Sequence, residues 1–387
     1  MKTDTSLGRL PSIDILRGLV MVIMTLDHTR DFFSDAHFNP TDLNKTSAIL
    51  FLTRWITHFC APVFVFLAGT SAYFWFWSRG AAAPISAFLL KRGLLLLVLT
   101  YFVEALAWDF RHDFRHIYGG VLWAIAWSLI VLAGLVKLPI SWVVWLGGLM
   151  IVLHNAFDLL KPAGLEGFGP WWAVLHTGDS VQLAEGWVLY PYYPLIPWMG
   201  VMAVGYGFGK WMTINRLRIR KSLLGLGFSL IAVFFVLRFS NLYGDPKPWQ
   251  FFSDPVFTVL SFINCHKYPP SLLYLLMTLG PAIVVLGLVE GLPANRFKFL
   301  QVFGRTPLFF YLLHLYLIHL SALVVAVVDS GPVSVLIGPP ELPNDYGYGL
   351  PVVYLLWLIM LLIMYPVCRS FEALKVNKPH WRWLNYL

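Results

Sequence analysis

Long apolar stretches of roughly twenty residues, separated by short polar segments, run through almost the whole chain. About 20 residues of α-helix cross the roughly 30 Å hydrocarbon core of a bilayer. The pattern predicts ten transmembrane helices, at 12–33, 50–77, 87–107, 117–136, 140–160, 192–213, 222–240, 271–290, 302–328 and 350–369. We therefore expect an all-α, polytopic membrane protein of about ten spans, with residues 1–387 forming a single membrane-embedded domain.

Charged residues outside the apolar stretches predict the orientation of the spans. Lys and Arg concentrate in alternate segments, among them 210–221 and 369–382, whereas the segment 329–349 has three acids and no Lys or Arg. Cytoplasmic loops of membrane proteins are enriched in Lys and Arg. We therefore expect both termini to lie in the cytoplasm and the longer loops 161–191, 241–270 and 329–349 to lie outside.

Composition supports a membrane protein and excludes several other classes. The chain is 58% hydrophobic and 12% charged, whereas a soluble domain has about 25% charged residues. The net charge of +8 does not indicate nucleic-acid binding, because no basic patch with interleaved aromatic residues is present. Cys60, Cys265 and Cys368 are too scattered for a disulfide or zinc framework. The first apolar stretch is predicted to be retained, because it contains charges and lacks a signal-peptide cleavage site.

The first predicted helix carries unusually many polar side chains for a membrane span. Arg17 and His28 are eleven residues apart, which places them on one helix face, roughly 16 Å apart along the axis. Asp14 is three residues before Arg17 and is predicted to pair with it; Asp31 is three residues after His28 and is predicted to orient the imidazole. A cation at the inner mouth and a histidine at the outer end suit transfer of a group across the membrane. From spacing alone, however, a structural Asp14–Arg17 pair with a packed His28 is the stronger interpretation.

Other histidines give weaker signals. His37, Arg54 and His58 are expected at the outer end of the first two helices, where three histidines would meet. A buried His58, bonded to a carbonyl that Pro62 frees, is about equally consistent with the sequence. His112 and His116 have the i, i+4 spacing of a metal pair, but no further ligands are evident, so we predict no metal. His314 and His319 lie about 140° apart around a helix and cannot share a ligand.

Three segments resemble a known family. Residues 9–28 (RLPSIDILRGLVMVIMTLDH), 62–71 (PVFVFLAGTS) and 304–314 (GRTPLFFYLLH) resemble the bacterial form of the heparan-alpha-glucosaminide N-acetyltransferase catalytic-domain family. Arg17 and His28 also match the first-helix pattern of the acyltransferase-3 membrane acyltransferases, which look distantly related. In the lysosomal enzyme an asparagine takes the position of His28 and a histidine lies in the following loop, where His37 is the nearest counterpart here.

The resemblance implies transfer of an acetyl or other short acyl group from cytosolic acetyl-CoA to a sugar or amino sugar on the outer side of the membrane. The membrane implied is the bacterial inner (cytoplasmic) membrane. It implies His28 as the catalytic base or nucleophile, with Asp31 orienting it and His37 as the second choice. Arg17, Asp14 and Arg305 would bind the donor, and Arg54 and His58 the glycan acceptor. Two alternatives to an enzyme remain: a secondary transporter of a small polar or anionic solute, and a scaffold protein. A homo-oligomer is compatible with all three functions.

Overall fold

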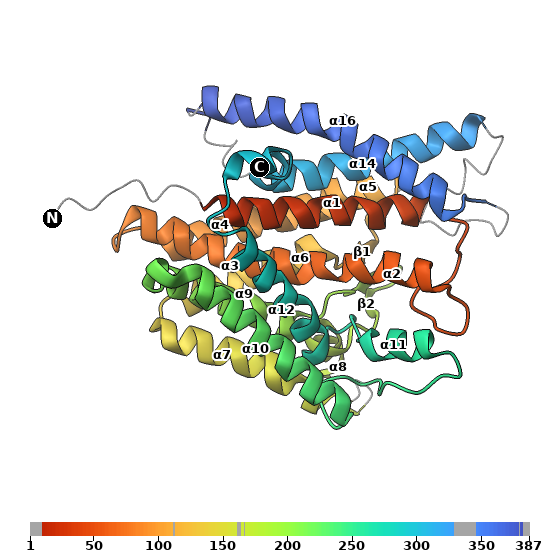
Figure 1. The fold of residues 1–387 in the computed structure, drawn as a ribbon, viewed down its shortest axis with the longest axis horizontal. Helices are drawn as coiled ribbons and strands as arrows, with labels where there is room; N and C mark the ends of the chain where they lie inside the picture. Colours follow the sequence, from red (N-terminus) through yellow and green to blue (C-terminus); the bar gives the residue numbers. More distant parts are fainter. Residues whose placement is uncertain are drawn as a thin grey trace.

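The computed structural model describes residues 10–110, 113–160, 164–165, 167–328, 346–378 and 380–381 of the chain. Helices form most of the described structure, and the long ones run side by side (Figure 1). The predicted all-α membrane fold is confirmed, because seven of the described helices are long and apolar enough to cross a membrane. The described part does not include Arg9, His112 or most of the predicted loop 329–349.

The elements are bounded as follows. The long helices are α1 (Pro11–Phe33), α3 (Cys60–Arg79), α4 (Ile85–Val98), α6 (Val121–Leu135), α7 (Ile140–Leu153), α9 (Leu195–Ile214), α10 (Ile219–Ser240), α12 (Leu272–Val289), α14 (Pro307–Val328) and α16 (Leu350–Asn377). The shorter α-helices are α2 (Ala48–Ile56), α5 (Ala105–Trp108), α8 (Gly169–Trp172), α11 (Pro255–Ile263) and α13 (Lys298–Arg305). The 3-10 helices are η1 (Thr57–Phe59), η3 (His154–Phe157), η6 (Arg216–Arg218) and η7 (Ala294–Phe297), and the π-helices are η2 (Leu99–Glu104) and η5 (Ala173–Thr177). The strands are β1 (His116–Tyr118), β2 (Val181–Ala184) and β3 (Trp187–Tyr190).

Each of the ten predicted spans contains one of these long helices, but the count of ten is not confirmed. The seven apolar helices correspond to the predicted spans other than those that formed α1, α6 and α9. α6 is apolar but only 15 residues long. α1 has Asp14, Arg17, Asp27 and Arg30 along its length, and this charge sets it apart from the seven.

Two predicted spans are corrected at their starts. The segment 302–328 is not one helix, because α13 ends at Arg305 and α14 begins at Pro307. Proline has no N–H to donate and disfavours helical conformation in the residue before it, so it fits the first position of a new helix. The segment 117–136 begins in β1, and its helix starts only at Val121.

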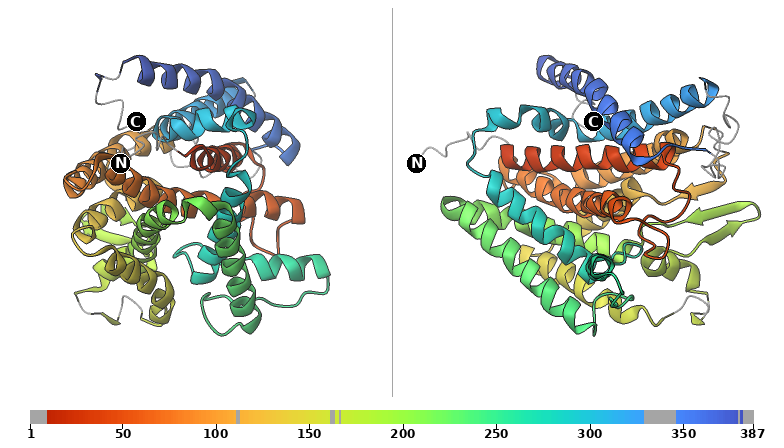
Figure 2. Two further views of the ribbon diagram at one scale, coloured as in Figure 1. Left: turned by 60° about the vertical axis from the view of Figure 1, so that its left-hand side comes forward. Right: turned by 45° about the vertical axis from the view of Figure 1, so that its right-hand side comes forward.

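α1 lies inside the bundle and organises the part of the chain that carries the predicted site. It packs against α3, α12, α13, α14 and α16, so it brings together the beginning and the end of the chain (Figure 2). α13 runs antiparallel to α1 at very short range: a Cβ built on Gly18 would lie 1.9 Å from the Leu300 carbonyl oxygen, and one on Gly304 would lie 1.9 Å from the Asp14 carbonyl oxygen. Only glycine permits this approach at both positions.

A small sheet and several loops cover one end of the bundle. The strand order is β1-β3-β2, with β1 parallel and β2 antiparallel to β3. The β2–β3 hairpin projects from the end opposite to the start of α1 (Figure 2). We call the end at which α1 begins the N-terminal end of the bundle and the opposite one the far end. The sheet was not predicted, because its strands have only three or four residues and lie between apolar helices.

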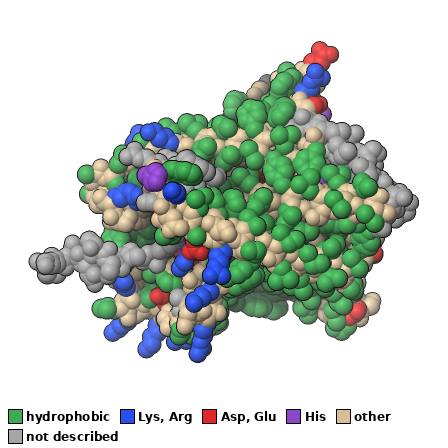
Figure 3. Space-filling model, turned by 90° about the horizontal axis from the view of Figure 1, so that it is seen from above, with side chains coloured by type: hydrophobic (Ala, Val, Ile, Leu, Met, Phe, Trp, Pro, Cys, Tyr) green, Lys and Arg blue, Asp and Glu red, His purple; other side chains and the backbone are tan. Residues whose placement is uncertain are grey.

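The surface divides by side-chain type. A broad hydrophobic surface covers the middle of the molecule, and Lys and Arg side chains gather at the N-terminal end (Figure 3). Large apolar side chains on α10 and α16 are well exposed, for example Val236 and Leu362 at 70% each. Exposed apolar side chains of this kind are suited to lipid rather than water.

Candidate functional site

A cavity of about 750 Å³ enters the bundle from the N-terminal end. Residues from Leu10 to Met21 of the chain's beginning line one wall, and this stretch covers roughly 16 Å of helix. Arg79 and Arg216, at the ends of their helices, line it near the surface, and Tyr311 of α14 lines it deep in the bundle. A volume of this size is typical of pockets for cofactor-sized ligands.

The cavity wall is positively charged and otherwise mostly apolar. Its lining includes six basic and two acidic side chains: Arg17, Arg79, Arg92, Arg216, Arg305 and Lys375, with Asp14 and Glu290. Phe64, Trp75, Phe88 and leucines supply much of the apolar wall. Guanidinium groups bind phosphate and carboxylate oxygens by paired hydrogen bonds. The cavity is therefore suited to a long ligand with an anionic group near the surface and an uncharged, flexible remainder deeper inside.

Arg17 lines this cavity and also ties three helices together. Its guanidinium donates to the Ser71 hydroxyl of α3 (2.8 Å) and to the Gly304 carbonyl of α13 (3.0 Å), and it lies 3.4 Å from Asp14. The predicted Asp14–Arg17 ion pair is thus present. Arg305 joins the same group, 3.5 Å from Asp14 and 2.7 Å from Glu372.

His28 contacts a second histidine that lies far away in the sequence. Its Nδ1 is 2.7 Å from Nε2 of His314 on α14, and the two rings lie nearly parallel, 19° apart. His314 donates from its own Nδ1–H to the Phe310 carbonyl (2.9 Å), so a neutral His314 must accept at Nε2. His28 then donates from Nδ1, and its Nε2 holds the lone pair. This arrangement fixes the tautomer of His28 and leaves Nε2 as the basic and nucleophilic atom.

Aromatic side chains surround the histidine pair. The Trp108 ring lies edge-on to His28 with centroids 5.1 Å apart, and the Tyr311 ring is 6.3 Å away. Tyr311 also lines the cavity, so the cavity reaches a neighbour of the histidine pair, although neither histidine lines it. His28 remains only partly buried, whereas His314 is fully buried.

The predicted partner of His28 is wrong. Asp31 forms an ion pair with Arg30 (2.5 Å) and has no contact with the imidazole among the described residues. Its side chain is 37% exposed, so it points away from the interior in which His28 meets His314. Spacing along one helix could not reveal this, because the actual partner lies on α14.

Among the described residues, no hydrogen bond joins the three histidines that were predicted to meet. His37 donates to, or accepts from, no other histidine in the described structure; its Nε2 is 2.7 Å from the Tyr346 carbonyl oxygen. The His58 ring packs edge-on against Tyr274, and the His58 carbonyl accepts the Tyr274 hydroxyl (2.7 Å). His58 Nδ1 has no hydrogen-bond partner among the described residues. This atom therefore does not make the predicted alternative contact, a hydrogen bond to a backbone carbonyl that Pro62 leaves unpaired.

Beyond His28, toward the far end, charged side chains form a compact group. Asp27 pairs with Arg30 (2.9 Å) and with Arg54 of α2. Lys267, a buried lysine of the loop before α12, is close enough to Asp27 to interact electrostatically. Arg54, which was predicted to bind the acceptor, lies near His28 in space. Its guanidinium forms an ion pair with Asp27, the residue before His28.

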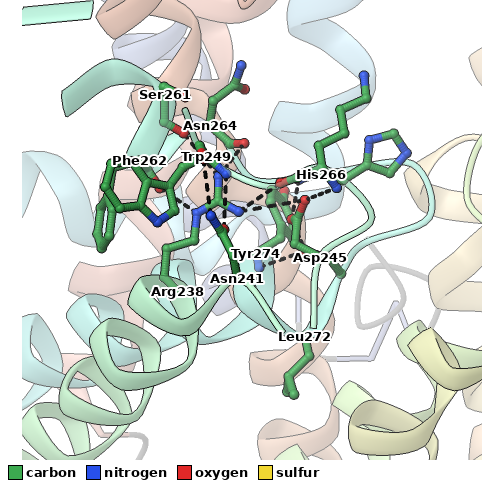
Figure 4. A network of polar contacts seen from close by, with 12 residues as sticks. Arg238, Asn241, Asp245, Trp249, Ser261, Phe262, Asn264, His266, Leu272 and Tyr274 are labelled. Atoms are coloured by element: carbon green, nitrogen blue, oxygen red, sulfur yellow. Dashed lines mark hydrogen bonds and ion pairs between the residues drawn. The ribbon is translucent and has the colours of Figure 1, made fainter. Parts of the chain in front are cut away.

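The loop that carries Lys267 is ordered by one buried arginine at the end of α10 (Figure 4). Arg238 is 1% exposed and lies 3.9 Å from Asp245. Its guanidinium donates to four carbonyls, those of Phe262 (2.8 Å), Lys247 (2.9 Å), Ser261 (3.0 Å) and Asn264 (3.3 Å). Asp245 in turn accepts from the His266 backbone N–H (2.8 Å) and the Ser271 hydroxyl (2.7 Å). The segment 241–271 is thereby folded back over the far end of the bundle.

Four residues near His28 were not predicted as site residues: Glu104, Trp108, Tyr311 and His314. Glu104 carries a usable signal, since it is the single acid in the apolar stretch 87–107, and a charge inside a span marks function by default. Among the described residues no group of three His, Cys, Asp or Glu side chains could hold a metal. His116, half of the weak metal pair, lies 3.3 Å from Asp113 at the surface.

The sequence matches one family model, described as heparan-alpha-glucosaminide N-acetyltransferase, catalytic, over residues 9–237. The match covers more than half of the chain and includes Arg17, His28 and Glu104, whereas Tyr311 and His314 lie beyond it. A search of the curated proteins finds no match.

Proposed function

Because the chain belongs to the heparan-alpha-glucosaminide N-acetyltransferase catalytic-domain family, we propose that it transfers an acetyl group from cytosolic acetyl-CoA to an amino sugar or sugar on the other side of the membrane. The family makes it an acetyltransferase, and its apolar helices make it a membrane protein. The donor, the sidedness and the acceptor are the parts that we propose.

One observation carries the proposal: a single cavity joins a basic mouth at the N-terminal end to the surroundings of His28. CoA has phosphates at one end and an acyl thioester at the end of a long flexible arm. Arg79, Arg92 and Arg216 are suited to the phosphates, and the apolar walls are suited to the arm. The thioester then arrives at Tyr311, beside the histidine pair.

His28 would act as the general base or as the nucleophile. Its Nε2 is the atom with the free lone pair, because Nδ1 donates to His314. As a base it removes a proton from the acceptor amine or hydroxyl, while the acceptor attacks the thioester carbonyl carbon. As a nucleophile it first takes the acetyl group itself and then passes it on. Arg54 and Lys267 place positive charge beyond His28, on the side from which the acceptor would enter.

The experiment uses purified protein in lipid vesicles, with acetyl-CoA labelled in the acetyl group on one face and glucosamine on the other. We expect labelled acetylglucosamine to appear only in the presence of the protein. His28→Ala protein should bind acetyl-CoA and form no product. Failure of the wild-type protein to bind acetyl-CoA would contradict the proposal, and uptake of solute without acetylation would indicate a transporter instead.

A further inference from the structure

Glu104 is a buried carboxyl group that neither the family match nor the proposed function assigns. It closes the π-helical turn η2, between α4 and α5, and is 4% exposed. π-helical turns insert an extra residue and are frequent at functional sites. An ionisable group at this position in a membrane span is costly, so its presence calls for an explanation.

A structural ion pair does not supply that explanation. Among the described residues no Lys or Arg pairs with Glu104. One carboxyl oxygen, Oε1, accepts a hydrogen bond from the Tyr311 hydroxyl, and the other, Oε2, has no hydrogen-bond partner in the described structure. The carboxyl group also faces Gly120, where a Cβ would lie 3.4 Å from Oε1.

Tyr311 connects this carboxyl group to the cavity. Its side chain lines the deep end of the cavity and lies between Glu104 and the two histidines. The Tyr311 ring centroid is 5.7 Å from that of His314 and 6.3 Å from that of His28. A ligand that reaches this part of the cavity meets Tyr311, whose hydroxyl is hydrogen-bonded to Glu104.

The proposed reaction needs a proton at this place. When the C–S bond of a thioester breaks, its electron pair remains on sulfur, and a bare thiolate is poorly stabilised away from water. We propose that Tyr311 is a catalytic residue that protonates the departing CoA sulfur, and that Glu104 acts through Tyr311 by holding and resupplying the proton. This inference rests on the proposed function and adds a second acid–base group to it.

The step balances within the protein and its two substrates. The acceptor attacks the carbonyl carbon and gives its proton to His28 Nε2; the C–S bond breaks; the phenol proton of Tyr311 goes to sulfur. For this step the Tyr311 O–H turns from Glu104 Oε1 toward sulfur, and the Tyr311–Glu104 hydrogen bond reverses, so that the neutral Glu104 carboxyl group donates its proton to the phenolate oxygen. The imidazolium then loses its proton and Glu104 regains one, so the products are acetylated acceptor and CoA thiol, with the enzyme unchanged.

The test compares Tyr311→Phe and Glu104→Gln with Tyr316→Phe. Tyr316 is the matched control, because it lies on the same helix, donates its hydroxyl to the Val103 carbonyl of the same π-helical turn (2.7 Å) and does not line the cavity. Loss of an acid catalyst typically lowers the rate about 10²–10⁴-fold. We expect that loss in kcat for Tyr311→Phe and Glu104→Gln, a donor KM within about twofold of wild type, and near-normal kinetics for Tyr316→Phe.

The pH profile separates a proton-donating role from a packing role. Among the described residues, Tyr311 is the titratable group in contact with Glu104, with His28 and His314 behind it. Wild-type kcat should fall at high pH, where Glu104 loses its proton, and at low pH, where His28 becomes protonated and cannot act as a base. Glu104→Gln should lose the fall at high pH and keep the fall at low pH. If wild type transfers acetyl and both variants keep its kcat or its full profile, the inference is wrong and the proposed function stands. If wild type transfers nothing, the proposed function itself fails, and this inference with it.

Discussion

His28 is oriented by another histidine rather than by a carboxylate. A carboxylate partner stabilises an imidazolium ion, whereas neutral His314 offers only a lone pair to the Nδ1–H of His28. The His314 ring is itself oriented by the hydrogen bond from its Nδ1–H to the Phe310 carbonyl. The pair therefore specifies which nitrogen of His28 reacts, without adding a negative charge to the interior.

The catalytic role of His28 can be tested against that of His37. Removing a general base typically costs about 10²–10⁴-fold in rate, so His28→Ala should abolish measurable transfer and retain acetyl-CoA binding. His37→Ala should have a smaller effect, because its ring is bonded to the Tyr346 carbonyl. Initial rates of acetyl transfer and donor binding on the same preparations measure both. Near-normal turnover in His28→Ala would reject the assignment, and loss of activity only in His37→Ala would move it to the loop.

Arg17 combines a role in packing with a predicted role in donor binding. Losing a charge-assisted hydrogen bond costs about 1.5–3 kcal/mol, or roughly 10- to 100-fold in affinity. Arg17→Ala should weaken acetyl-CoA binding by that factor and also lower the thermal unfolding midpoint, because the contacts with Ser71 and Gly304 are lost. Arg218→Ala is the control, an exposed cation that does not line the cavity. Titration calorimetry would contradict the assignment if Arg17→Ala kept wild-type affinity.

At this scale the sequence predicted contacts within a helix better than contacts between helices. The Asp14–Arg17 pair follows from three-residue spacing and is present. Asp31 has the same spacing from His28 and pairs elsewhere, because a carboxylate in reach of Arg30 gains more from a cation than from a neutral ring. His314 lies 286 residues from His28, and no pattern along one helix can identify such a partner.

Among the elements, the α1–α13 contact shows what hydropathy cannot predict. The stretch 302–328 looks like a continuous span because hydropathy does not depend on chain direction, yet the chain reverses at Thr306 and Pro307. The reversal lays α13 antiparallel to α1 and brings Gly304 to Asp14 and Gly18 to Leu300. The sequence Gly304-Arg-Thr-Pro307 contained the signal for a helix break, since proline disfavours helix in the residue before it.

The close approach of α1 and α13 predicts a strong effect of a single methyl group. Overpacking typically costs about 1–3 kcal/mol, and the Gly18→Ala methyl would meet backbone atoms that cannot rotate away. We expect a clear fall in the thermal unfolding midpoint in detergent. Gly148→Ala on α7 should leave the midpoint equal or slightly higher, because nothing lies within 4 Å of the new Cβ and alanine favours helix. Equal midpoints for both variants would show that the two helices do not approach this closely.

The arginine-centred loop at the far end makes a second prediction for an element. Arg238→Gln removes the guanidinium shared by four carbonyls (Figure 4), so the segment 241–271 should open to protease. Arg220→Gln, at the exposed start of the same helix, should resist like wild type. Limited proteolysis followed by mass spectrometry locates the cuts. Equal resistance of both variants would mean that the loop does not depend on Arg238.

The same loop should weaken in acid. Burial lowers the pKa of His266, and the nearby Asp245 carboxylate offsets this only in part. An unfolded histidine takes up its proton near pH 6.5, so below that pH the open loop binds more protons than the closed one. Stability of the closed loop is therefore complete above about pH 6.5 and declines as the pH falls. Proteolysis of 241–271 should be faster at pH 5 than at pH 7.5. The difference between the two rates should be smaller in His266→Gln.

On the scale of the whole molecule, the apolar pattern predicted where helices form, whereas the orientation inferred from the basic residues stays a prediction. Every predicted span contains a helix, but only seven of the described helices are both long and apolar enough to be recognised as spans on their own. The gathering of Lys and Arg at the N-terminal end (Figure 3) has the form expected of a cytoplasmic surface. The sheet at the far end could not be predicted, because pairing between short strands depends on the helices that bring them together.

The orientation can be tested by labelling introduced cysteines, because Cys60, Cys265 and Cys368 are all buried and give little background. Leu217 and Leu242 are 102% and 87% exposed, at the two ends of α10. In intact cells, an impermeant maleimide should label Leu242→Cys and miss Leu217→Cys until the membrane is opened. Labelling of Leu217→Cys from outside would reverse the proposed orientation and place the cavity mouth on the wrong side for cytosolic acetyl-CoA.

The position of α1 has a consequence for how the protein is made. α1 leaves the ribosome before the other described helices, with Asp14, Arg17, Asp27 and Arg30 already on it. Some of its partners, including Gly304, Arg305 and His314, are synthesised only after most of the chain has emerged. Until then, these charges can pair only with one another along α1, and hydrocarbon does not replace the contacts that the later helices supply, so we expect the insertion machinery to retain α1 or to receive it back. α1 is thus translated before the other described helices and is still among the last to reach its final surroundings, and a nascent chain that stops before α13 would leave it without them.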